Sequence, residues 1–140
     1  MLSGPSRGYI IRNLKKLKIS FSHYYFKNYD DVIKLYSLID VYVISSRVEG
    51  GPRAILESMA SGAVVFSTRV GQAEEIIKNN KNGYLYNKDE IKFVSKKIIN
   101  IFNDIKKRKK IVKEGKSTSV KFSYPKTRQK WLNFFNSINS

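Results

Sequence analysis

An α/β fold with a parallel sheet and flanking helices is predicted by three features of this 140-residue sequence. Two near-continuous apolar runs, at 41–45 and 63–67, are typical of strands buried on both faces. Residues 53–61 between them form a predicted helix, and two strands joined by a helical crossover run parallel in one sheet. From residue 89 onward the apolar residues recur at helical spacing, which indicates helices that pack on the sheet.

The remaining elements are predicted in chain order from the same kinds of pattern. A helix is expected over 8–18, where apolar residues recur at helical spacing between lysines, and a short strand over 22–27. A second helix is expected over 30–38, because Asp30 and Asp31 would lie in its positively polarised first turn. Beyond the second buried strand follow a short helix over 72–78, a turn at Asn82-Gly83 and a strand over 84–86.

Residues 89–140 are expected to form a basic, helical C-terminal part of the same domain. One apolar stripe marks its first helix: Ile91, Val94, Ile98, Ile101 and Ile105. A second basic segment follows at 106–117, and a final one lies around 126–135. We expect three aromatic residues to anchor this last segment on the sheet: Trp131, Phe134 and Phe135.

The charge of the chain is strongly positive and uneven. The 27 Lys and Arg residues outnumber the 11 Asp and Glu residues, which gives a formal net charge of +16. Residues 88–140 carry 15 basic and 4 acidic side chains, and so hold +11 of that excess. Such a surface attracts nucleic acid, anionic lipid or a phosphorylated small molecule through the same Coulomb field. A composition biased toward lysine, with 20 Lys against 7 Arg, explains the excess without any function.

Composition excludes several classes of site. The absence of cysteine rules out disulfides, cysteine-ligated zinc and a thiol nucleophile, and a single histidine, His23, rules out a histidine-rich metal cluster. No apolar run approaches the roughly 20 residues that a transmembrane helix needs. The first residues lack the basic and apolar regions of a secretory signal, so a cytoplasmic location is expected.

The segment 45–62 carries the strongest indication of a binding site. It begins at the carboxyl end of a buried strand, where open α/β sheets place their ligands. Gly50 and Gly51 let backbone amides approach a ligand closely, and Pro52 suits the first position of a helix. The amino end of that helix favours phosphate. Two arginines flank it, Arg47 and Arg53.

Two glutamates frame the same segment. Glu49 precedes the helix and Glu57 lies about one turn inside it, and both carboxylates are suited to accept hydrogen bonds from sugar hydroxyls. For each glutamate there is also an explanation that involves no ligand. The helix dipole alone could favour Glu49, while Glu57 could lie on a solvated helix face or pair with Arg53.

The spacing from Glu49 to Glu57, a glutamate, seven residues and a second glutamate, resembles the hallmark of retaining glycosyltransferases with two Rossmann-like domains, the GT-B type. The resemblance is to group 1, family 4, of these enzymes. It continues through four further segments, 35–43, 58–62, 70–77 and 82–85. It implies that residues 1–140 are an incomplete C-terminal domain that binds a nucleotide-sugar on a Rossmann-like parallel sheet.

The resemblance also implies a reaction. A sugar would pass from the nucleotide-sugar to a glycan or lipid-linked acceptor with retention at the anomeric carbon, in cell-surface polysaccharide synthesis, without a metal or other cofactor. Glu49 would be the catalytic residue and would position the transferred sugar in a front-face mechanism rather than act as a nucleophile. Glu57 would bind the ribose hydroxyls. The donor-binding residues implied are Glu49, Gly50, Gly51, Pro52, Arg53 and Glu57.

The sequence departs from the family pattern at its beginning. It lacks the acceptor-binding N-terminal domain and the Arg…Lys pair after the first strand of the donor domain, and Ser3-Gly4-Pro5 resembles the end of the second strand. In the strand order 3-2-1-4-5-6 the missing strands are central, so the strand at 22–27 would lose its neighbour and that at 41–45 would expose an edge. We therefore expect a fragment or truncated gene product that is inactive alone.

A function of a different class stays open. The basic residues of 88–140 would also suit a nucleic-acid or anionic-membrane binding module without catalysis. The apolar stripe of the first C-terminal helix argues for core packing instead, so no nucleic-acid partner is expected. Peripheral contact with anionic lipid at the inner membrane face is compatible with a transferase and is kept as an expectation.

Overall fold

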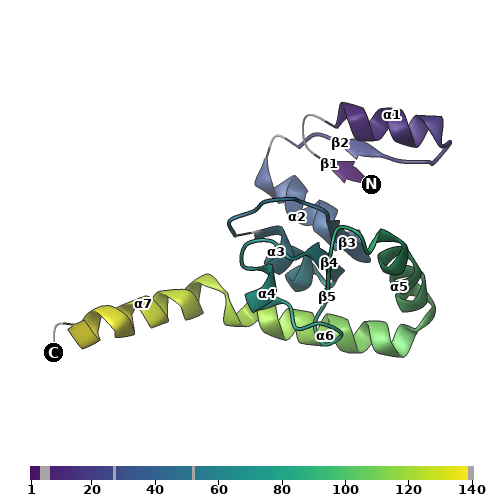
Figure 1. Ribbon diagram of the computed structural model, residues 1–140. Coiled ribbons are helices and arrows are strands. Elements are labelled where there is room, and N and C mark those ends of the chain that lie inside the picture. The colour runs from purple at the N-terminus through teal and green to yellow at the C-terminus, as the bar shows by residue number, and fades with distance from the viewer. Residues whose placement is uncertain (4–6, 27, 52, 139–140) are drawn as a thin grey trace. The chain divides into compact units, whose positions relative to one another are not determined.

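The computed structural model describes residues 1–3, 7–26, 28–51 and 53–138 of the chain (Figure 1). It separates into two compact units, Met1–Leu35 and Tyr36–Ser140, which are described in turn. The strand end expected at Gly4-Pro5 and the helix start expected at Pro52 lie outside the described residues.

The first unit contains a two-stranded parallel sheet and a helix. Strand β1 (Leu2–Ser3) pairs with β2 (His23–Tyr24), and α1 (Gly8–Lys16) connects them. The helix predicted over 8–18 is confirmed, whereas the strand predicted over 22–27 is limited to two residues. The expectation that this strand has no neighbour was wrong, because the short β1 is enough to pair with it.

Helix α2 (Tyr29–Ser37) crosses the boundary between the units and agrees with the helix predicted over 30–38. The Asn28 side chain accepts a hydrogen bond from the backbone amide of Asp31 at 2.9 Å, which satisfies one donor of the first turn. The last turn carries Tyr36, whose buried side chain belongs to the second unit.

The second unit is built on a three-stranded parallel sheet in the order β3-β4-β5, which confirms the predicted sheet. The elements are β3 (Val41–Ile44), the crossover helix α3 (Arg53–Ser61), β4 (Val64–Thr68) and β5 (Tyr84–Tyr86). All five residues of the central strand β4 are buried. Strand β3 has no second neighbour among the described strands, and Val43 is exposed, as expected for an open edge.

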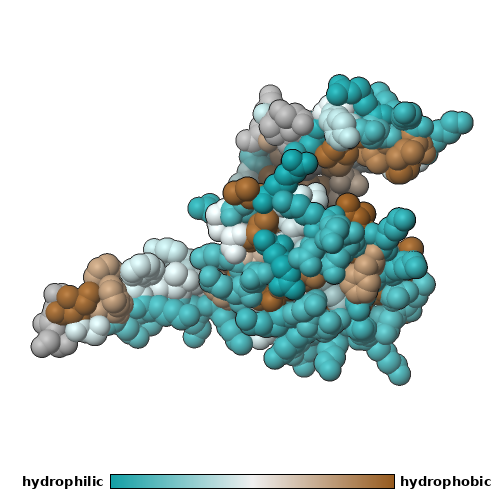
Figure 2. All heavy atoms as spheres, viewed as in Figure 1, coloured by the Kyte–Doolittle hydropathy of each residue, from teal (hydrophilic) through white to brown (hydrophobic). Residues whose placement is uncertain are grey.

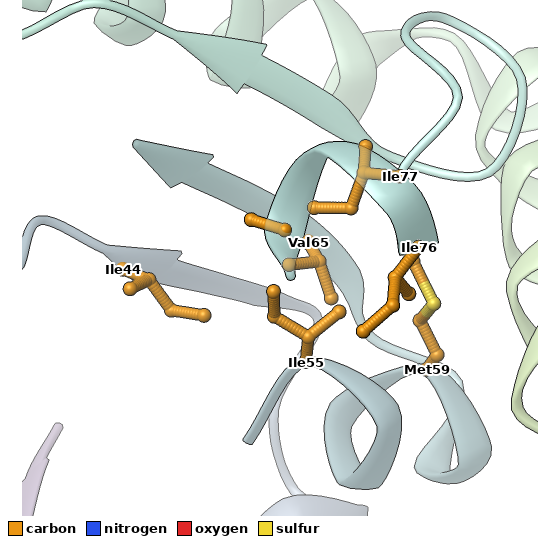
Figure 3. Packing of buried hydrophobic residues seen from close by; sticks show 7 residues of the cluster. Ile44, Ile55, Met59, Val65, Ile76 and Ile77 are labelled. Atoms are coloured by element: carbon orange, nitrogen blue, oxygen red, sulfur yellow. The ribbon is translucent and has the colours of Figure 1, made fainter. Parts of the chain in front are cut away.

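Two hydrophobic clusters lie on opposite faces of β4, because successive residues of a strand point to opposite sides. Figure 3 shows the first, which joins β3, α3 and α4 (Ala73–Ile76): Ile44, Ile55, Met59, Val65, Ala73, Ile76 and Ile77. The second joins β5 and the helices α5 (Ile91–Asn103) and α6 (Ile105–Lys121): Val64, Phe66, Tyr84, Tyr86, Val94, Ile101 and Ile111. The central strand is therefore covered by helices on both faces.

The apolar stripe predicted for the first C-terminal helix is confirmed in its middle. Val94 and Ile101 are buried and Ile98 is half-buried, whereas Ile91 and Ile105 at the two ends are exposed. The stripe thus supports the core along the centre of α5, where the helix lies over the sheet.

Helix α6 packs closely on α3. Its first turn is capped by Asp104, whose side chain accepts a hydrogen bond from the amide of Lys107 at 2.9 Å. Gly115 is buried, and a Cβ at this position would lie 3.4 Å from Met59 Cγ of α3. Met59 of α3 therefore lies against the backbone of α6 at this position.

Helix α7 (Tyr124–Ile138) does not pack on the sheet as predicted, since none of its described residues is buried. Figure 1 shows α7 extending past the end of α6, and Figure 2 shows apolar side chains on its surface. Trp131, Phe134 and Phe135 are 57%, 53% and 54% exposed, and their ring centroids lie 5.6–6.1 Å apart. The expectation of an anchor on the sheet was wrong, because these rings pack on one another within one helix.

Candidate functional site

Residues 45–51 form a loop that follows β3 and leads into α3. The loop lies beyond the carboxyl ends of β3 and β4, the usual ligand position in a parallel sheet. The predicted order of strand, loop and helix is therefore confirmed for the described residues. Helix α3 begins at Arg53, so its first amides, which have no partner inside the helix, point back toward the loop.

Two hydrogen bonds from neighbouring strands fix the backbone at the start of the loop. The Tyr86 hydroxyl of β5 donates to the carbonyl oxygen of Ile44 at 2.8 Å, in a buried position. The Thr68 hydroxyl at the end of β4 donates to the carbonyl oxygen of Ser46, also at 2.8 Å. Burial raises the pKa of Tyr86, so its hydroxyl keeps its proton, and stays a donor, to a higher pH than that of an exposed tyrosine.

The backbone of Glu49 and Gly50 lies directly against Gly71, in the loop after β4. Gly71 has a φ of +48°, in the left-handed region that favours glycine, and a Cβ here would overlap the backbone oxygens of both residues. Gln72 approaches the same loop, since its Oε1 would lie 3.3 Å from a Cβ on Gly51. The course of the loop after β3 therefore depends on the absence of a side chain at position 71.

Glu49 is exposed, and its Oε1 accepts a hydrogen bond from the Ser46 hydroxyl at 2.8 Å. The same Ser46 is held through its carbonyl oxygen by Thr68, so the carboxylate is linked to the fixed part of the loop. An ionised carboxylate offers about four acceptor sites. The contact with Ser46 leaves sites for the hydroxyl groups of a ligand.

Glu57 is half-buried about one turn inside α3, and its carboxylate accepts a hydrogen bond from the Tyr36 hydroxyl. The ring of Tyr36 lies 5.7 Å from that of Tyr42, and their hydroxyls are also hydrogen-bonded. Burial is the main cause that raises the pKa of Tyr36 well above its usual range, and Tyr42 and the negative charge of Glu57 raise it further. The sequence suggested a solvated helix face or a pairing with Arg53 for Glu57, and neither alternative includes this contact with Tyr36.

The predicted site residues fall into two groups in the structure. Glu49, Gly50 and Gly51 share one loop, while Glu57 lies on the helix that follows. Arg47 and Arg53 are exposed, so their guanidinium groups are accessible to an anion. The predicted role of Pro52 concerns a residue outside those described.

Sequence reasoning missed the residues that support the site. Thr68 and Tyr86 bond to positions 22 and 42 residues away, and Tyr36 precedes Glu57 by 21 positions. No local spacing or periodicity connects such pairs. The sequence does predict that these residues lie on elements which the parallel sheet brings close together. It does not predict which hydroxyl bonds to which carbonyl oxygen or carboxylate.

Among residues 1–3, 7–26, 28–51 and 53–138, no group of three or more His, Cys, Asp or Glu side chains is placed to hold a metal ion. Within the same ranges, no helix is long and apolar enough to cross a membrane. The expectation that the reaction needs no metal or other cofactor stays a prediction.

Relatives of the chain are glycosyltransferases. The sequence model of the family "Glycosyl transferases group 1" matches residues 4–118. Glycosyltransferase MJ1178 of Methanocaldococcus jannaschii is 34% identical over 100 residues, which cover 71% of this chain and 28% of that protein. An α-1,4-N-acetyl-D-galactosaminyltransferase of Campylobacter jejuni, whose name includes a PP-undecaprenol-linked glycan, is 29% identical over 104 residues, covering 74% and 29%. The chain thus spans less than a third of the length of these relatives.

Solved glycosyltransferases share the fold. Anabaena Alr3699/HepE, solved in complex with UDP-glucose, has a TM-score of 0.81 at 20% identity, covering 97% of this chain and 40% of that one. A Rickettsia africae glycosyltransferase has a TM-score of 0.79 at 27% identity, covering 100% and 39%. The C-terminal domain of LpcC from Francisella tularensis has a TM-score of 0.73 at 24% identity, covering 86% and 66%. The expected fold of a GT-B C-terminal domain is confirmed, and with the match over 4–118 the chain belongs to the glycosyl transferases of group 1.

Proposed function

We propose that this chain is the donor-binding portion of a retaining glycosyltransferase of family 4, which transfers a sugar from a nucleotide-sugar to a glycan or lipid-linked acceptor in cell-surface polysaccharide synthesis. The observation that carries the proposal is the anchored loop over 45–51, which presents Glu49 and leads into the helix that carries Glu57. HepE was solved with UDP-glucose and the C. jejuni relative is named for an undecaprenol-linked glycan, which supports both substrate classes. Residues 1–140 would belong to one partial domain of that enzyme, with 89–140 as its helical end.

The phosphates of the donor are proposed to bind at the start of α3. The first amides of a helix carry a partial positive charge, which favours phosphate. Gly50 and Gly51 add backbone amides without side chains, and a Cβ at Gly50 would meet nothing within 4 Å, so this stretch is open to a ligand. Two exposed arginines would add positive charge, Arg47 and Arg53.

The two glutamates are proposed to bind hydroxyl groups at different places on the donor. Glu49 would position the transferred sugar next to the reacting carbon, and Glu57 would accept hydrogen bonds from the ribose. Ser46 and Tyr36 each use one acceptor site of their carboxylate, out of about four. Each glutamate can therefore bind the donor while it keeps the contact that holds it.

Binding of nucleotide-sugars to the full chain tests the proposal. We expect Glu57→Ala to weaken binding of UDP-glucose, or of the best-bound donor in a panel, at least about tenfold, because a hydrogen bond to a charged group contributes about 1.5–3 kcal/mol. Titration calorimetry measures the loss. The matched control is Glu114→Ala, which removes a half-buried carboxylate of α6 and should leave binding unchanged. Equal affinity of Glu57→Ala and the unaltered chain would contradict the proposal.

Peripheral contact with an anionic membrane, at its cytoplasmic face, is a finer part of the proposal. Exposed aromatic and basic side chains occur together on α7: Trp131, Phe134, Phe135, Lys126, Arg128 and Lys130. Helices that combine these side chains bind membrane interfaces, where lipid-linked acceptors lie.

Vesicle sedimentation tests this part. We expect the chain to bind vesicles that contain anionic lipid at low salt, and to lose binding to neutral vesicles and at high salt. Duplex DNA is the control for charge alone. Equal binding to DNA would favour a nucleic-acid module instead, and no binding to anionic vesicles would remove the membrane contact.

A further inference from the structure

A chain of hydrogen-bonded side chains lies behind the second glutamate of the site. Tyr42 in β3, Tyr36 at the end of α2 and Glu57 in α3 are connected in this order, and all belong to the second unit. We propose that Tyr36 is a positioning residue, which holds the Glu57 carboxylate ready for the ribose hydroxyls of the donor. This inference rests on the donor-binding function proposed above.

Tyr36 and Glu57 are both partly withdrawn from water, so a hydrogen bond between them lowers the free-energy cost of burying their polar groups. Tyr36 has 9% of its surface exposed, and the hydroxyl of a buried tyrosine usually has a hydrogen-bond partner. Glu57 is half-buried, and a carboxylate withdrawn from water is costly unless it accepts hydrogen bonds. A bond from a hydroxyl to an ionised carboxylate is about twice as strong as a bond between neutral groups.

The Tyr36 hydroxyl has one proton to donate, and a carboxylate is an acceptor only. An ionised carboxylate has no proton, so the Tyr36 hydroxyl donates to Glu57. This uses the single proton of that hydroxyl, and the Tyr42 hydroxyl lies within hydrogen-bond reach of the same group. The ring contact between the tyrosines, with centroids 5.7 Å apart and planes tilted by 56°, holds them together.

A glutamate fixed in this way differs from one on a solvated helix face. A mobile carboxylate must be ordered when the ligand binds, and the lost freedom reduces affinity. The contact with Tyr36 fixes the direction of the Glu57 carboxylate before the donor arrives. Loss of the Tyr36 hydroxyl should therefore weaken donor binding through Glu57.

A double-mutant cycle in the full chain tests the positioning role. The probe is whichever of UDP, GDP and ADP binds best, measured by titration calorimetry. We expect Tyr36→Phe to weaken binding about three- to tenfold, the cost of ordering one side chain, which is less than the effect of Glu57→Ala. The double variant should bind no more weakly than Glu57→Ala alone, since no carboxylate is left to position.

The control is Tyr84→Phe, which removes a buried hydroxyl that has no hydrogen-bond partner among the described residues and lies in the other hydrophobic cluster. It should bind the nucleotide normally. Thermal unfolding of each variant shows whether the fold is retained.

A comparison of ribose with 2′,3′-dideoxyribose separates the positioning role from a loss of stability, because lower stability alone would not change the preference between the two nucleotides. The unaltered chain and Tyr84→Phe should prefer the nucleoside diphosphate over its 2′,3′-dideoxy analogue, and Tyr36→Phe should reduce that preference. If Tyr36→Phe weakens both ligands equally, or adds its full effect to Glu57→Ala, the positioning role is overturned while the proposed function stands. If Glu57→Ala has no effect, or no nucleotide binds, the function fails and this inference fails with it.

Discussion

The loop and helix over 45–61 and the C-terminal helix α7 both lie at the surface, but the rest of the chain supports them very differently. Hydrogen bonds from β4 and β5 fix the start of the loop, and Ile55 of α3 is fully buried. None of the described residues of α7 is buried, and its aromatic rings contact one another. An exposed Glu49 therefore belongs to an anchored element, whereas an exposed Trp131 belongs to an element that packs little on its neighbours.

The difference shows how exposure relates to function. A ligand site requires polar groups on a fixed backbone, because each group that must be ordered on binding reduces affinity. An exposed apolar face is instead typical of a surface that contacts another molecule or a membrane. Substitutions beneath the loop should accordingly affect folding and donor binding, while those on α7 should leave the fold unchanged.

The largest effect is expected from Ile55→Ala. Ile55 has 0% exposed surface and lies in the cluster of Figure 3, so its truncation removes apolar contacts and leaves a cavity. We expect the free energy of unfolding, measured by urea denaturation, to fall by about 2–5 kcal/mol. Ile138→Ala, the same change on α7, should alter it by less than about 0.5 kcal/mol. Similar losses for both variants would show that α7 is packed as firmly as α3.

Gly71→Ala should have the next largest effect. A methyl group here overlaps the backbone of Glu49 and Gly50 and requires a left-handed conformation, so we expect a loss of stability of about 1–3 kcal/mol. Donor affinity should fall as well, because the loop must move. Gly50→Ala is the control for stability, since its Cβ would meet nothing within 4 Å. A stable Gly71→Ala variant would mean that the loop is not held against position 71.

Tyr86→Phe removes one of the bonds that anchor the loop. The carbonyl oxygen of Ile44 loses a buried partner, and we expect the free energy of unfolding to fall by about 1–2 kcal/mol. Tyr84→Phe removes a hydroxyl that has no partner among the described residues, so it should be neutral or stabilising. A larger loss for Tyr84→Phe than for Tyr86→Phe would contradict the anchoring role.

The same anchor predicts a sensitivity to alkaline pH. Burial raises the pKa of Tyr86 above its ordinary value of 10.0, so the folded state keeps a proton that the unfolded state releases. The contribution to stability is complete below pH 10.0 and is lost as the pH rises further. Urea denaturation above that pH should show a shallower decline for Tyr86→Phe than for the unaltered chain. Parallel declines would mean that Tyr86 does not titrate in this range.

The smallest effect is expected at Trp131, the only tryptophan of the chain. It is 57% exposed on α7, so Trp131→Phe should change the free energy of unfolding by less than about 0.5 kcal/mol. Quenching of its fluorescence by acrylamide should be similar in the folded and the unfolded chain. Strong protection in the folded chain would show that α7 is buried against another surface.

The sequence predicts most of the second unit because its signals are local. The apolar runs of β3 and β4 need burial on two faces, and the helix between them fits a parallel crossover, so the sheet follows from the pattern alone. The two glutamates of the site can also be identified from the sequence, by the number of residues between them. Hydroxyl contacts that hold them, such as Tyr36 with Glu57, depend on side-chain geometry between separate elements and leave no periodic trace.

The failed prediction for α7 has a different cause. Its pattern of aromatic and basic residues shows that one face is apolar, but such a pattern does not show what covers that face. In α5 the stripe meets β5 and the sheet, whereas the rings of α7 pack mainly on one another. Amphipathicity alone therefore cannot locate a helix on the fold.

The open side of β3 has a consequence for how the protein behaves in solution. Along this strand the described sheet ends, so amide and carbonyl groups on one side have no ladder partner, and Val43 is 46% exposed beside them. Unpaired borders of this kind are templates onto which a strand from another copy can add. A strand that adds here would extend the three-stranded sheet and cover Val43. The net positive charge of the chain would oppose such an addition between two of its copies.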